Sequence, residues 1–354
     1  MTLLVTRCIL TLAALLAGAL VLTACSERQE LAGADAPPQP LEVMLHFPPS
    51  PEHVGLFAAR EADAFEDARL NVELTQPPEP SAPLRALQAG EVDIAISYEP
   101  ELLLARDRGA DLVSIGALVQ VPLTSVVSSG EDAVRRTGQL RGQRVATAGL
   151  AYQEALLRAI LQRKGVRPAD VALADVGFDL LDATVSDRFA AVFGATWNDE
   201  ALELDLADRR PAALRVQRLG VPTYAELVFV VRAQDARERG PLLRRFMQAV
   251  ARGHRTLRED PAEGTAALLR ENPDLDRAAT RASVRETLPL FFPVQEDAPE
   301  GEERPFGFQD LEKWDAFGRW MLANGLVRLP PNARAAATNE FLPGEGIAVE
   351  EGVP

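Results

Sequence analysis

The sequence predicts an α/β protein whose main body has two lobes. From residue 41 onward, short apolar segments alternate with amphipathic segments of helical periodicity, which is typical of largely parallel sheets covered by helices. The pattern pauses after residue 118, starts again at residue 143 and becomes almost entirely helical after residue 231. Two strand-rich blocks followed by a helical return segment indicate that the first lobe is completed by chain that comes back after the second.

The expected strands and helices are short, and glycines end several of the helices. Gly90, Gly109 and Gly165 each follow a helical segment, and glycine adopts the left-handed conformation of a helix C-cap without steric cost. The predicted strands are residues 41–47, 70–75, 92–97, 112–118, 143–148, 171–176, 189–194, 214–219 and 227–231. The predicted helices are residues 53–65, 81–89, 100–108, 153–164, 198–206, 240–257, 261–271, 277–290 and 309–324. We therefore expect lobe 1 to comprise residues 41–123 plus 222–342, lobe 2 residues 124–221, and a tail residues 343–354.

The first 24 residues have the layout of a secretory signal peptide. Arg7 is the only charge before an apolar run that ends in small residues and then Cys25. Residues 22–25 (LTAC) also resemble the bacterial lipobox, in which the signal peptide is cut before the cysteine and the thiol carries a lipid. The alternatives are an uncleaved membrane anchor and an ordinary cleavage site beside an incidental cysteine. We expect a signal peptide over 1–24 and a lipidated Cys25.

Residues 25–40 continue as a flexible tether, because they lack apolar periodicity and are rich in alanine, proline and charge. No later segment reaches the ~18 consecutive apolar residues that a membrane span needs. We therefore expect a protein of the cell envelope that is lipid-anchored to a membrane and faces the periplasm or the exterior. Its contact with the membrane would be through the lipid only.

The composition excludes several classes of protein. The formal net charge of −15 would repel a phosphate backbone, so we expect no nucleic acid partner. Cys8 and Cys25 are the only cysteines, which rules out a disulfide framework and a cysteine-based zinc site. Lys164 and Lys313 are the only lysines, and both lie in predicted helices away from the expected ligand crevice. Their positions argue against a lysine Schiff base.

Motifs of enzymes and metal sites are scarce. The chain has no nucleophile elbow, zinc-binding His-Glu-x-x-His helix, phosphate-binding lysine loop or calcium loop. His46 and His53 lack a partner at metal-ligand spacing, since the third histidine is His254, inside a predicted helix. We therefore expect no catalytic residue, no metal site and no cofactor.

Aromatic residues and glutamates gather where predicted strands end. In open α/β sheets, ligands bind beyond the carboxyl ends of the strands, and two strands run into the sequences YEPE (98–101) and WNDE (197–200). Tyr152 opens a helix, and Tyr224 precedes Glu226 and another strand. Facing rings with a few carboxylates suit a flat, partly apolar ring that bears N–H donors.

Each of these residues also has a plainer interpretation. Glu101 and Glu200 lie near helix starts, where a carboxylate can cap backbone N–H groups and interact with the helix dipole. Tyr98, Trp197 and Tyr224 could serve as packing between the lobes. The sequence leaves both interpretations open.

Six segments resemble the NMT1/THI5-like family in consistent order. Residues 48–58 (PPSPEHVGLFA) resemble its amino-terminal Pro-Asn-x-x-His-x-Gly-aromatic stretch, and 93–106 (DIAISYEPELLLAR) its Ser-Tyr-x-Pro-Glu segment. Residues 194–200 (GATWNDE) are similar to its Trp-Asn-x-Glu motif, and 220–227 (GVPTYAEL) to its Val-Pro-x-Tyr-x-x-Leu motif. The carboxyl end resembles the family over 314–326 and 338–343. The resemblance covers roughly residues 41–343.

The resemblance implies an α/β fold of the type II periplasmic-binding-protein kind, with two lobes and a ligand cleft between them. The function it implies is the solute-binding component of an ABC importer in thiamine biosynthesis, a monomer that works with a permease. The expected ligand is an aminopyrimidine, formylaminopyrimidine or hydroxymethylpyrimidine. The strand ends and the family motifs together give these candidate ligand-binding residues: Phe47, His53, Tyr98, Glu99, Tyr152, Trp197, Asn198, Glu200, Tyr224 and Glu226.

Three alternatives remain at the sequence level. The ligand could be another small heteroaromatic, such as riboflavin, or a sulfonate, although a sulfonate would prefer arginine or helix-terminal amides. The protein could also be a pyrimidine-processing enzyme of the same family. The eukaryotic enzymes of this family use a lysine for pyridoxal phosphate and a cysteine-rich motif. This chain has no lysine near the amino-terminal motif and only Cys25 after signal-peptide removal, so we expect a binding protein and not an enzyme.

Overall fold

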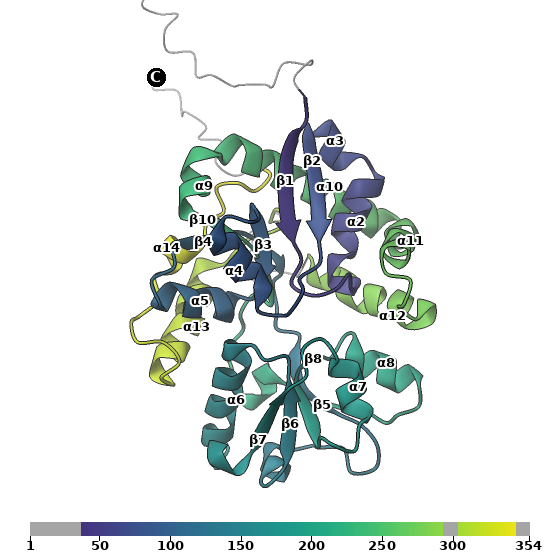
Figure 1. Cartoon of the computed structure of the whole chain (residues 1–354), viewed down its shortest axis with the longest axis vertical. Coiled ribbons are helices and arrows are strands. Elements are labelled where there is room, and N and C mark those ends of the chain that lie inside the picture. The colour runs from purple at the N-terminus through teal and green to yellow at the C-terminus, as the bar shows by residue number, and fades with distance from the viewer. Residues whose placement is uncertain (1–36, 293–303, 345–354) are drawn as a thin grey trace, which may run out of the picture. The chain divides into compact units, whose positions relative to one another are not determined.

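The computed structural model describes residues 37–292 and 304–344, which form two α/β lobes (Figure 1). Sheet A has the strand order β2-β1-β3-β10-β4, and sheet B has the order β7-β6-β8-β5-β9. We call sheet A with its helices lobe 1 and sheet B with its helices lobe 2. The structure confirms the predicted α/β class and the two lobes. The predicted signal peptide and Cys25 lie outside the described residues.

The bounds of the elements follow the chain. Sheet A consists of β1 (Gln39–Met44), β2 (Leu70–Thr75), β3 (Ile94–Ser97), β4 (Leu112–Val119) and β10 (Leu227–Arg232). Sheet B consists of β5 (Thr124–Ser128), β6 (Arg144–Thr147), β7 (Ala172–Asp175), β8 (Ala191–Thr196) and β9 (Ala212–Arg215). The helices are α2 (Val54–Glu61), α3 (Ala64–Asp67), α4 (Ala82–Ala89), α5 (Glu99–Asp107), α6 (Ala151–Arg163), α7 (Leu180–Val185), α8 (Glu200–Leu206), α9 (Ala233–Glu238), α10 (Gly240–Glu259), α11 (Pro261–Glu271), α12 (Arg277–Thr287), α13 (Leu311–Ala323) and α14 (Ala333–Ala336). Short 3-10 helices are η1 (Pro51–His53), η2 (Thr137–Leu140), η3 (Pro168–Asp170), η4 (Val216–Leu219) and η5 (Leu288–Leu290).

Two stretches of chain join the lobes. The first crossing segment, residues 120–123, leads from β4 to β5, and the second crossing segment, residues 220–226, leads from η4 to β10. In sheet A, β1 pairs in parallel with β2 and β3, whereas β10 runs antiparallel to β3 and β4. In sheet B, β6 pairs in parallel with β7 and β8, whereas β5 runs antiparallel to β8 and β9. Each crossing segment thus enters its new sheet as an antiparallel strand.

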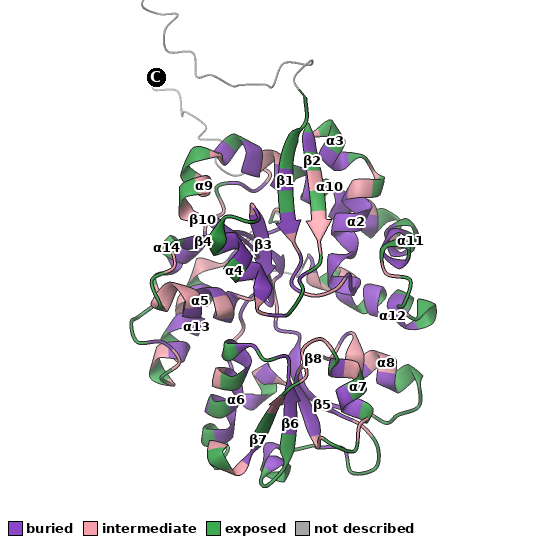
Figure 2. Cartoon of the chain, in the orientation of Figure 1, coloured by how far each residue is buried: buried purple, intermediate pink, exposed green. Residues whose placement is uncertain are grey.

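Burial shows which strands form the core of each lobe. Every residue of β3, β4 and β5 is buried, whereas β7 is largely exposed at the edge of sheet B (Figure 2). Phe229 of β10 meets Phe246 of α10 edge to face, with ring centroids 5.7 Å apart. Both rings are fully buried, and each buried phenylalanine stabilises the fold by about 1.5–3 kcal/mol.

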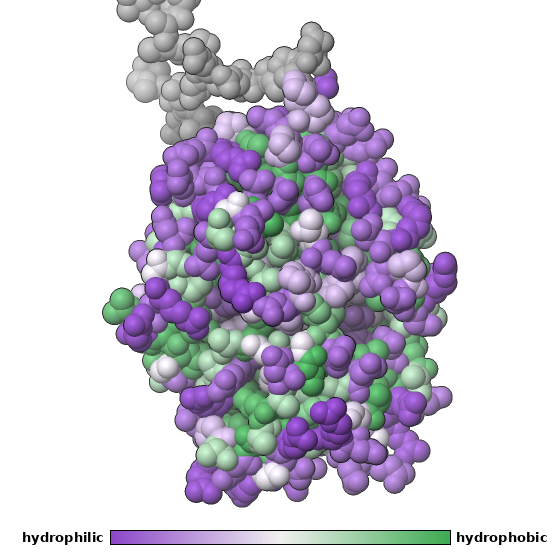
Figure 3. Space-filling model, viewed as in Figure 1, coloured by the Kyte–Doolittle hydropathy of each residue, from purple (hydrophilic) through white to green (hydrophobic). Residues whose placement is uncertain are grey.

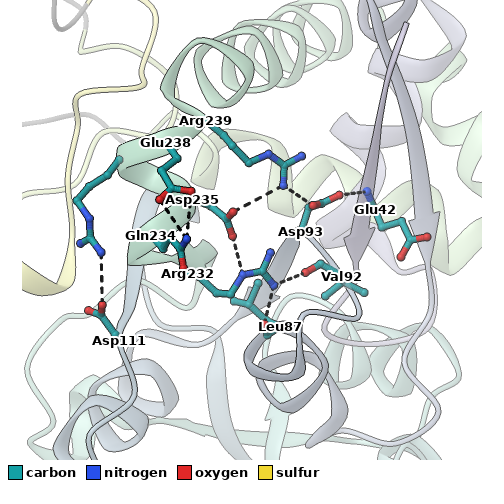
Figure 4. A network of polar contacts seen from close by, with 11 residues as sticks. Glu42, Leu87, Val92, Asp93, Asp111, Arg232, Gln234, Asp235, Glu238 and Arg239 are labelled. Carbon is teal, nitrogen blue, oxygen red and sulfur yellow. Dashed lines mark hydrogen bonds and ion pairs between the residues drawn. The ribbon is translucent and has the colours of Figure 1, made fainter.

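An arginine network fixes the end of lobe 1 that lies away from the pocket side of the sheet (Figure 4). Arg232, the last residue of β10, donates to the carbonyls of Leu87 and Val92 at 2.8 and 2.9 Å. Arg239 pairs with Asp93, which in turn accepts from the backbone N–H of Glu42 at 2.9 Å. These bonds join the α4–β3 turn to β10 and β1, on the side away from the strand ends where ligands are expected.

The surface of the face shown in Figure 3 is mostly hydrophilic over lobe 1, and hydrophobic residues show more often over lobe 2. Leu173, Val185 and Leu206, all in lobe 2, are 40%, 47% and 55% exposed. None of the helices in the described ranges is both long enough and apolar enough to cross a membrane.

Several predicted elements differ from the observed ones. The predicted helix over 53–65 is divided into the end of η1, α2 and α3, and Asp63, which adopts a left-handed conformation with φ of 49°, separates α2 from α3. The predicted strand over 214–219 is β9 followed by η4, and β5 and α7 were not predicted. β1 begins at Gln39, so the predicted tether over 25–40 would end two residues earlier.

Candidate functional site

A pocket lies between the two lobes, at the ends of β1, β3 and β8. The cavity itself is small, about 30 Å³, and the hollow around it, which opens to solvent, holds about 420 Å³ free of protein atoms. Lobe 1 and its crossing segments contribute His46, Phe47, Ser50, Glu52, Tyr98, Leu123, Glu226 and Leu227, and lobe 2 contributes Leu180, Gly194, Thr196, Asp199 and Glu200. We call this the interlobe pocket.

Aromatic rings form one part of its wall. The Tyr98 ring lies 5.4 Å from the His46 ring, edge to face, and 4.7 Å from the ring of Tyr152. Phe47 meets Phe178 of lobe 2 edge to face at 4.9 Å. Tyr152 is buried behind Tyr98 and does not itself line the pocket. Tyr98 and Phe47 therefore offer the ring surfaces that a flat ligand can contact.

Carboxylates form another part of the wall. One oxygen of Glu200, Oε2, accepts from both the backbone N–H and the hydroxyl of Thr196 at 2.7 Å. Glu226 accepts from the N–H groups of Leu123 and Thr124 at 2.7 and 3.2 Å and from the Thr124 hydroxyl at 2.6 Å. Glu226 thus fixes the first crossing segment. Both bonds of Glu200 go to Oε2, and its other oxygen, Oε1, takes no part in them.

Burial changes the protonation of this acidic wall. It raises the pKa of Glu200 to about 7 and that of Glu226 above its ordinary value. The pKa of Asp199 is raised well above its ordinary value, first by burial and then by the charges of Glu52 and Glu200. Ionising these groups together is costly without a compensating ligand. The wall is therefore suited to a ligand that brings N–H donors or positive charge.

Among the residues that the structure describes, neither arginine nor lysine lines the wall. Within the described ranges, no group of three or more histidine, cysteine, aspartate or glutamate side chains is arranged to hold a metal ion. Gly194 brings backbone close to the pocket. Its φ is 110°, and a Cβ there would lie 2.3 Å from Gln153 Nε2, so a larger residue would be strained.

Residues 198 and 199 of the Trp-Asn-Asp-Glu motif bind lobe 2 to lobe 1. Asn198 Nδ2 donates to Glu52 Oε1 at 3.0 Å and to Thr287 Oγ1 at 2.8 Å. The hydroxyl of Ser283 donates to Asp199 Oδ1 at 2.7 Å. Asn198 is fully buried, so its amide joins the lobes beside the pocket and does not line it.

The structure brings four of the ten candidate ligand-binding residues to the pocket wall: Phe47, Tyr98, Glu200 and Glu226. His53 and Tyr152 lie directly behind His46 and Tyr98. Trp197 is elsewhere. Its Nε1 donates to the Pro122 carbonyl at 3.3 Å, and the Arg215 guanidinium carbon lies 3.7 Å from the ring centroid.

Glu99 and Tyr224 line a different pocket, which lies against both crossing segments and the start of α13. Glu99 is fully buried, and its Oε2 accepts from the N–H of Ala225 at 2.6 Å. Burial raises the pKa of Glu99 to about 8. Tyr224 packs against Phe317, with ring centroids 4.8 Å apart. These two residues therefore support the second crossing segment.

Sequence reasoning missed part of the wall: His46, Ser50, Glu52, Leu180, Thr196 and Asp199. His46 was considered only as a metal ligand. Its place two residues after the end of β1 was the signal available, since the end of that strand borders the cleft. Leu180 had no signal, because the short helix α7 was not predicted.

Comparison with known proteins places this geometry in a family. A family model described as NMT1/THI5 like matches residues 50–264, and the chain belongs to this family. It is 30% identical to the formylaminopyrimidine-binding protein of Halalkalibacterium halodurans, over 91% of this chain and 96% of that protein. It is 21% identical to a 4-amino-5-hydroxymethyl-2-methylpyrimidine phosphate synthase of Saccharomyces cerevisiae, over 84% of this chain and 86% of that protein.

The fold is that of periplasmic binding proteins. The structure of the alkanesulfonate-binding protein SsuA from Xanthomonas axonopodis pv. citri matches with a TM-score of 0.64 at 20% identity, over 86% of this chain and 99% of that one. This confirms the predicted fold class. At this level of identity the likeness concerns the fold alone.

Proposed function

We propose that the protein is the extracytoplasmic solute-binding component of an ABC importer, and that it captures a thiamine pyrimidine precursor, formylaminopyrimidine or hydroxymethylpyrimidine. The observation that carries this proposal is the interlobe pocket, where carboxylates from both lobes meet aromatic rings of lobe 1, and where the described residues contribute no arginine or lysine. The 30% identical relative is named for the same class of ligand.

The chemistry of an aminopyrimidine matches this wall. Its exocyclic amine donates hydrogen bonds, which the carboxylate of Glu200 can accept, and its ring has two faces for contact with Tyr98 or Phe47. Burial disfavours ionised Glu200, and an amine placed against it would offset that penalty. The bonds of Asn198 to Glu52 and Thr287 would hold the lobes closed around the ligand.

A sulfonate is the main alternative ligand within the binding class. An anion requires cationic groups or free N–H donors, but the wall has four carboxylates: Glu52, Asp199, Glu200 and Glu226. Bringing a sulfonate among these side chains would add repulsion. The pocket therefore favours an aminopyrimidine, although the fold is shared with sulfonate-binding proteins.

The rival from another class is the pyrimidine-producing enzyme, as in the synthases of this family. Such an enzyme would need a lysine for pyridoxal phosphate, and the residues here do not fit that group. Neither Lys164 nor Lys313 lines the interlobe pocket. Lys313 instead lies 3.3 Å from the carboxylate of Asp310 in an ion pair. We therefore propose a binding protein without catalytic activity or cofactor.

We further propose that Cys25 carries a lipid after removal of residues 1–24, and that the two-lobed body acts as a monomer with a membrane permease. Lobe 1 would comprise residues 41–123 plus 222–342, and lobe 2 residues 124–221. Cys25→Ala should release the protein from the membrane fraction of expressing cells. Retention of the variant in that fraction would argue against lipidation.

A melting and turnover experiment tests the proposed function. The purified protein is heated with hydroxymethylpyrimidine, formylaminopyrimidine, riboflavin or an alkanesulfonate, and each mixture is then analysed by mass spectrometry. A ligand that binds the folded state at 100 times its Kd adds about 2.7 kcal/mol to stability. We expect a raised Tm with the two pyrimidines and their recovery unchanged. A raised Tm with the sulfonate alone, or conversion of a pyrimidine, would overturn the proposal.

A further inference from the structure

Two buried histidines form a chain of hydrogen bonds that ends at the interlobe pocket. His53, in η1, is fully buried, and its Nε2 lies 2.9 Å from His46 Nδ1. His46 lines the pocket and keeps 8% of its surface exposed. The proposed function assigns no part to either ring.

The first bond of this chain has a fixed direction. The backbone N–H of Ser50 donates to His53 Nδ1 at 3.2 Å, which completes a capping box in which the N3 side chain accepts from the N-cap backbone. A backbone amide is always a donor, so His53 Nδ1 must be unprotonated. The Ser50 hydroxyl lies 3.1 Å from the same nitrogen, but it donates its proton to Glu52 Oε2 at 2.9 Å.

Both rings are neutral at physiological pH. Burial lowers the pKa of His46 to about 3 and that of His53 well below its ordinary value, the latter also because of His46. A neutral imidazole carries one N–H and one acceptor nitrogen. His53 therefore has its proton on Nε2 and donates it to His46 Nδ1. The proton of His46 must then be on Nε2.

The charge of the pocket wall indicates a role for the Nε2 proton of His46. In their ionised forms, Glu52, Asp199, Glu200 and Glu226 suit the amine of an aminopyrimidine, but they would repel the lone pairs of its ring nitrogens. A fixed N–H among them would pair with one such nitrogen. We propose that the Ser50 amide, acting through His53, fixes His46 as a hydrogen-bond donor to a ring nitrogen of the bound aminopyrimidine. This inference rests on the proposed function, with His46 as a specificity residue and His53 as its positioning residue.

Nitrogen NMR of the histidine side chains tests the tautomers without any ligand. The chain has three histidines, and the third is an internal control, because His254 Nδ1 lies 2.8 Å from the Val250 carbonyl and must carry the proton itself. We expect His46 and His53 to be protonated on Nε2 and His254 on Nδ1. A proton on Nδ1 of His46 would overturn the inference.

Binding of hydroxymethylpyrimidine and of its two pyridine analogues, each with CH in place of one ring nitrogen, tests the contact. We expect the wild type to bind one analogue at least roughly tenfold more weakly than the pyrimidine. In His46→Phe, which keeps a ring but has no N–H, this ratio should fall to about twofold or less. An unchanged ratio would assign the donor to another group, such as the Tyr98 hydroxyl, and refute the role of His46.

A matched pair of variants tests the positioning role. In His53→Gln, the side chain can accept from the Ser50 amide and donate to His46, as a capping box with glutamine does, so the wild-type ratio should be kept. In His53→Leu both bonds are absent, and the ratio should fall as in His46→Phe. A lowered Tm in His53→Leu with an unchanged ratio would make His53 merely structural. Failure of the wild type to bind the pyrimidine would instead reject the proposed function, and NMR would still report the tautomers.

Discussion

The same short motif follows β3 in lobe 1 and β8 in lobe 2, but its residues have different roles in the two lobes. In each, an aromatic residue follows the strand and a glutamate stands three residues later: Tyr98 with Glu101, and Trp197 with Glu200. Each glutamate accepts from a hydroxyl four residues before it, Ser97 at 2.5 Å or Thr196 at 2.7 Å. Only Tyr98 from the first copy and Glu200 from the second line the interlobe pocket.

This difference separates contact with ligand from support of the fold. Local sequence gives both copies a helix start with a glutamate in its first turn, but the lobe that faces each side chain decides its role. Tyr98 meets the pocket because Tyr152 of lobe 2 packs behind it. Trp197 turns to the first crossing segment, where Pro122 accepts its N–H. The strand-end rule therefore finds the segment that borders the site but not which side chain enters it.

The largest expected effect is on the free energy of unfolding, when Trp197 is replaced. Trp197→Ala removes a half-buried ring with the Pro122 bond and the Arg215 contact, and it should lower the free energy of unfolding by about 3 kcal/mol. The affinity of the folded variant for hydroxymethylpyrimidine should change less than about twofold. Urea unfolding and calorimetry measure the two quantities. A variant that keeps its stability but loses binding would show that Trp197 contacts the ligand.

Tyr98→Ala should show the opposite result. Loss of the ring that faces the pocket should weaken binding by ~1–3 kcal/mol, as removal of an aromatic ring stacked on a base does. Both rings are partly buried, so Tyr98→Ala should also lower the Tm, and the affinity is the quantity that separates the two variants. Calorimetric titration against the wild type checks this. Unchanged affinity would contradict the assignment of Tyr98 to the pocket wall.

The two glutamates give a matched pair of smaller effects. Glu200→Gln should weaken binding about tenfold, or 1.4 kcal/mol, because a charged acceptor for the ligand amine is lost. Glu101→Gln removes the equivalent carboxylate from lobe 1, outside the pocket wall, and should leave affinity within about twofold. Equal losses of affinity in both variants would mean that the glutamates act through their helices.

Stability should also depend on pH. Burial raises the pKa of both Glu101 and Glu200 to about 7, so the folded state favours their protonated forms. Their contribution is complete at pH values below the ordinary glutamate pKa of about 4.5 and is lost as the pH rises through 7. Tm without ligand should therefore fall between about pH 5 and 8, and less steeply in either glutamine variant.

Ligand distinguishes the two carboxyls in the same experiment. Saturating hydroxymethylpyrimidine should flatten the pH dependence in the wild type and in Glu101→Gln, because the ligand amine stabilises ionised Glu200. It should leave the slope of Glu200→Gln nearly unchanged. If ligand does not change the slope of Tm against pH in the wild type, no donor reaches Glu200.

Much of the fold could be predicted from the sequence because it depends on local patterns. Strand β2 and helix α11 have the predicted bounds, and the return of the chain to lobe 1 was visible in the helical carboxyl end. Strand β5 could not be recognised. Its five residues are all buried without alternation, it starts two residues after Pro122, and its partners β8 and β9 are distant in sequence.

The site was harder to predict than the fold, because its members depend on which lobe covers which side chain. Glu99 and Glu101 are separated by one residue, yet Glu99 supports the second crossing segment and Glu101 binds the Ser97 hydroxyl. His46 acquires its role only through His53, whose tautomer is set by a backbone amide. Neither arrangement follows from residue type or from spacing along the chain.

The central claim is that the two lobes close around an aminopyrimidine and do not alter it. Isothermal titration of the purified protein with hydroxymethylpyrimidine, followed by mass spectrometry of the recovered ligand, tests it most directly. The account predicts one molecule bound per chain, recovered unchanged, with weaker binding in Glu200→Gln. Absence of binding, tighter binding of an alkanesulfonate, or recovery of a chemically altered pyrimidine would contradict it.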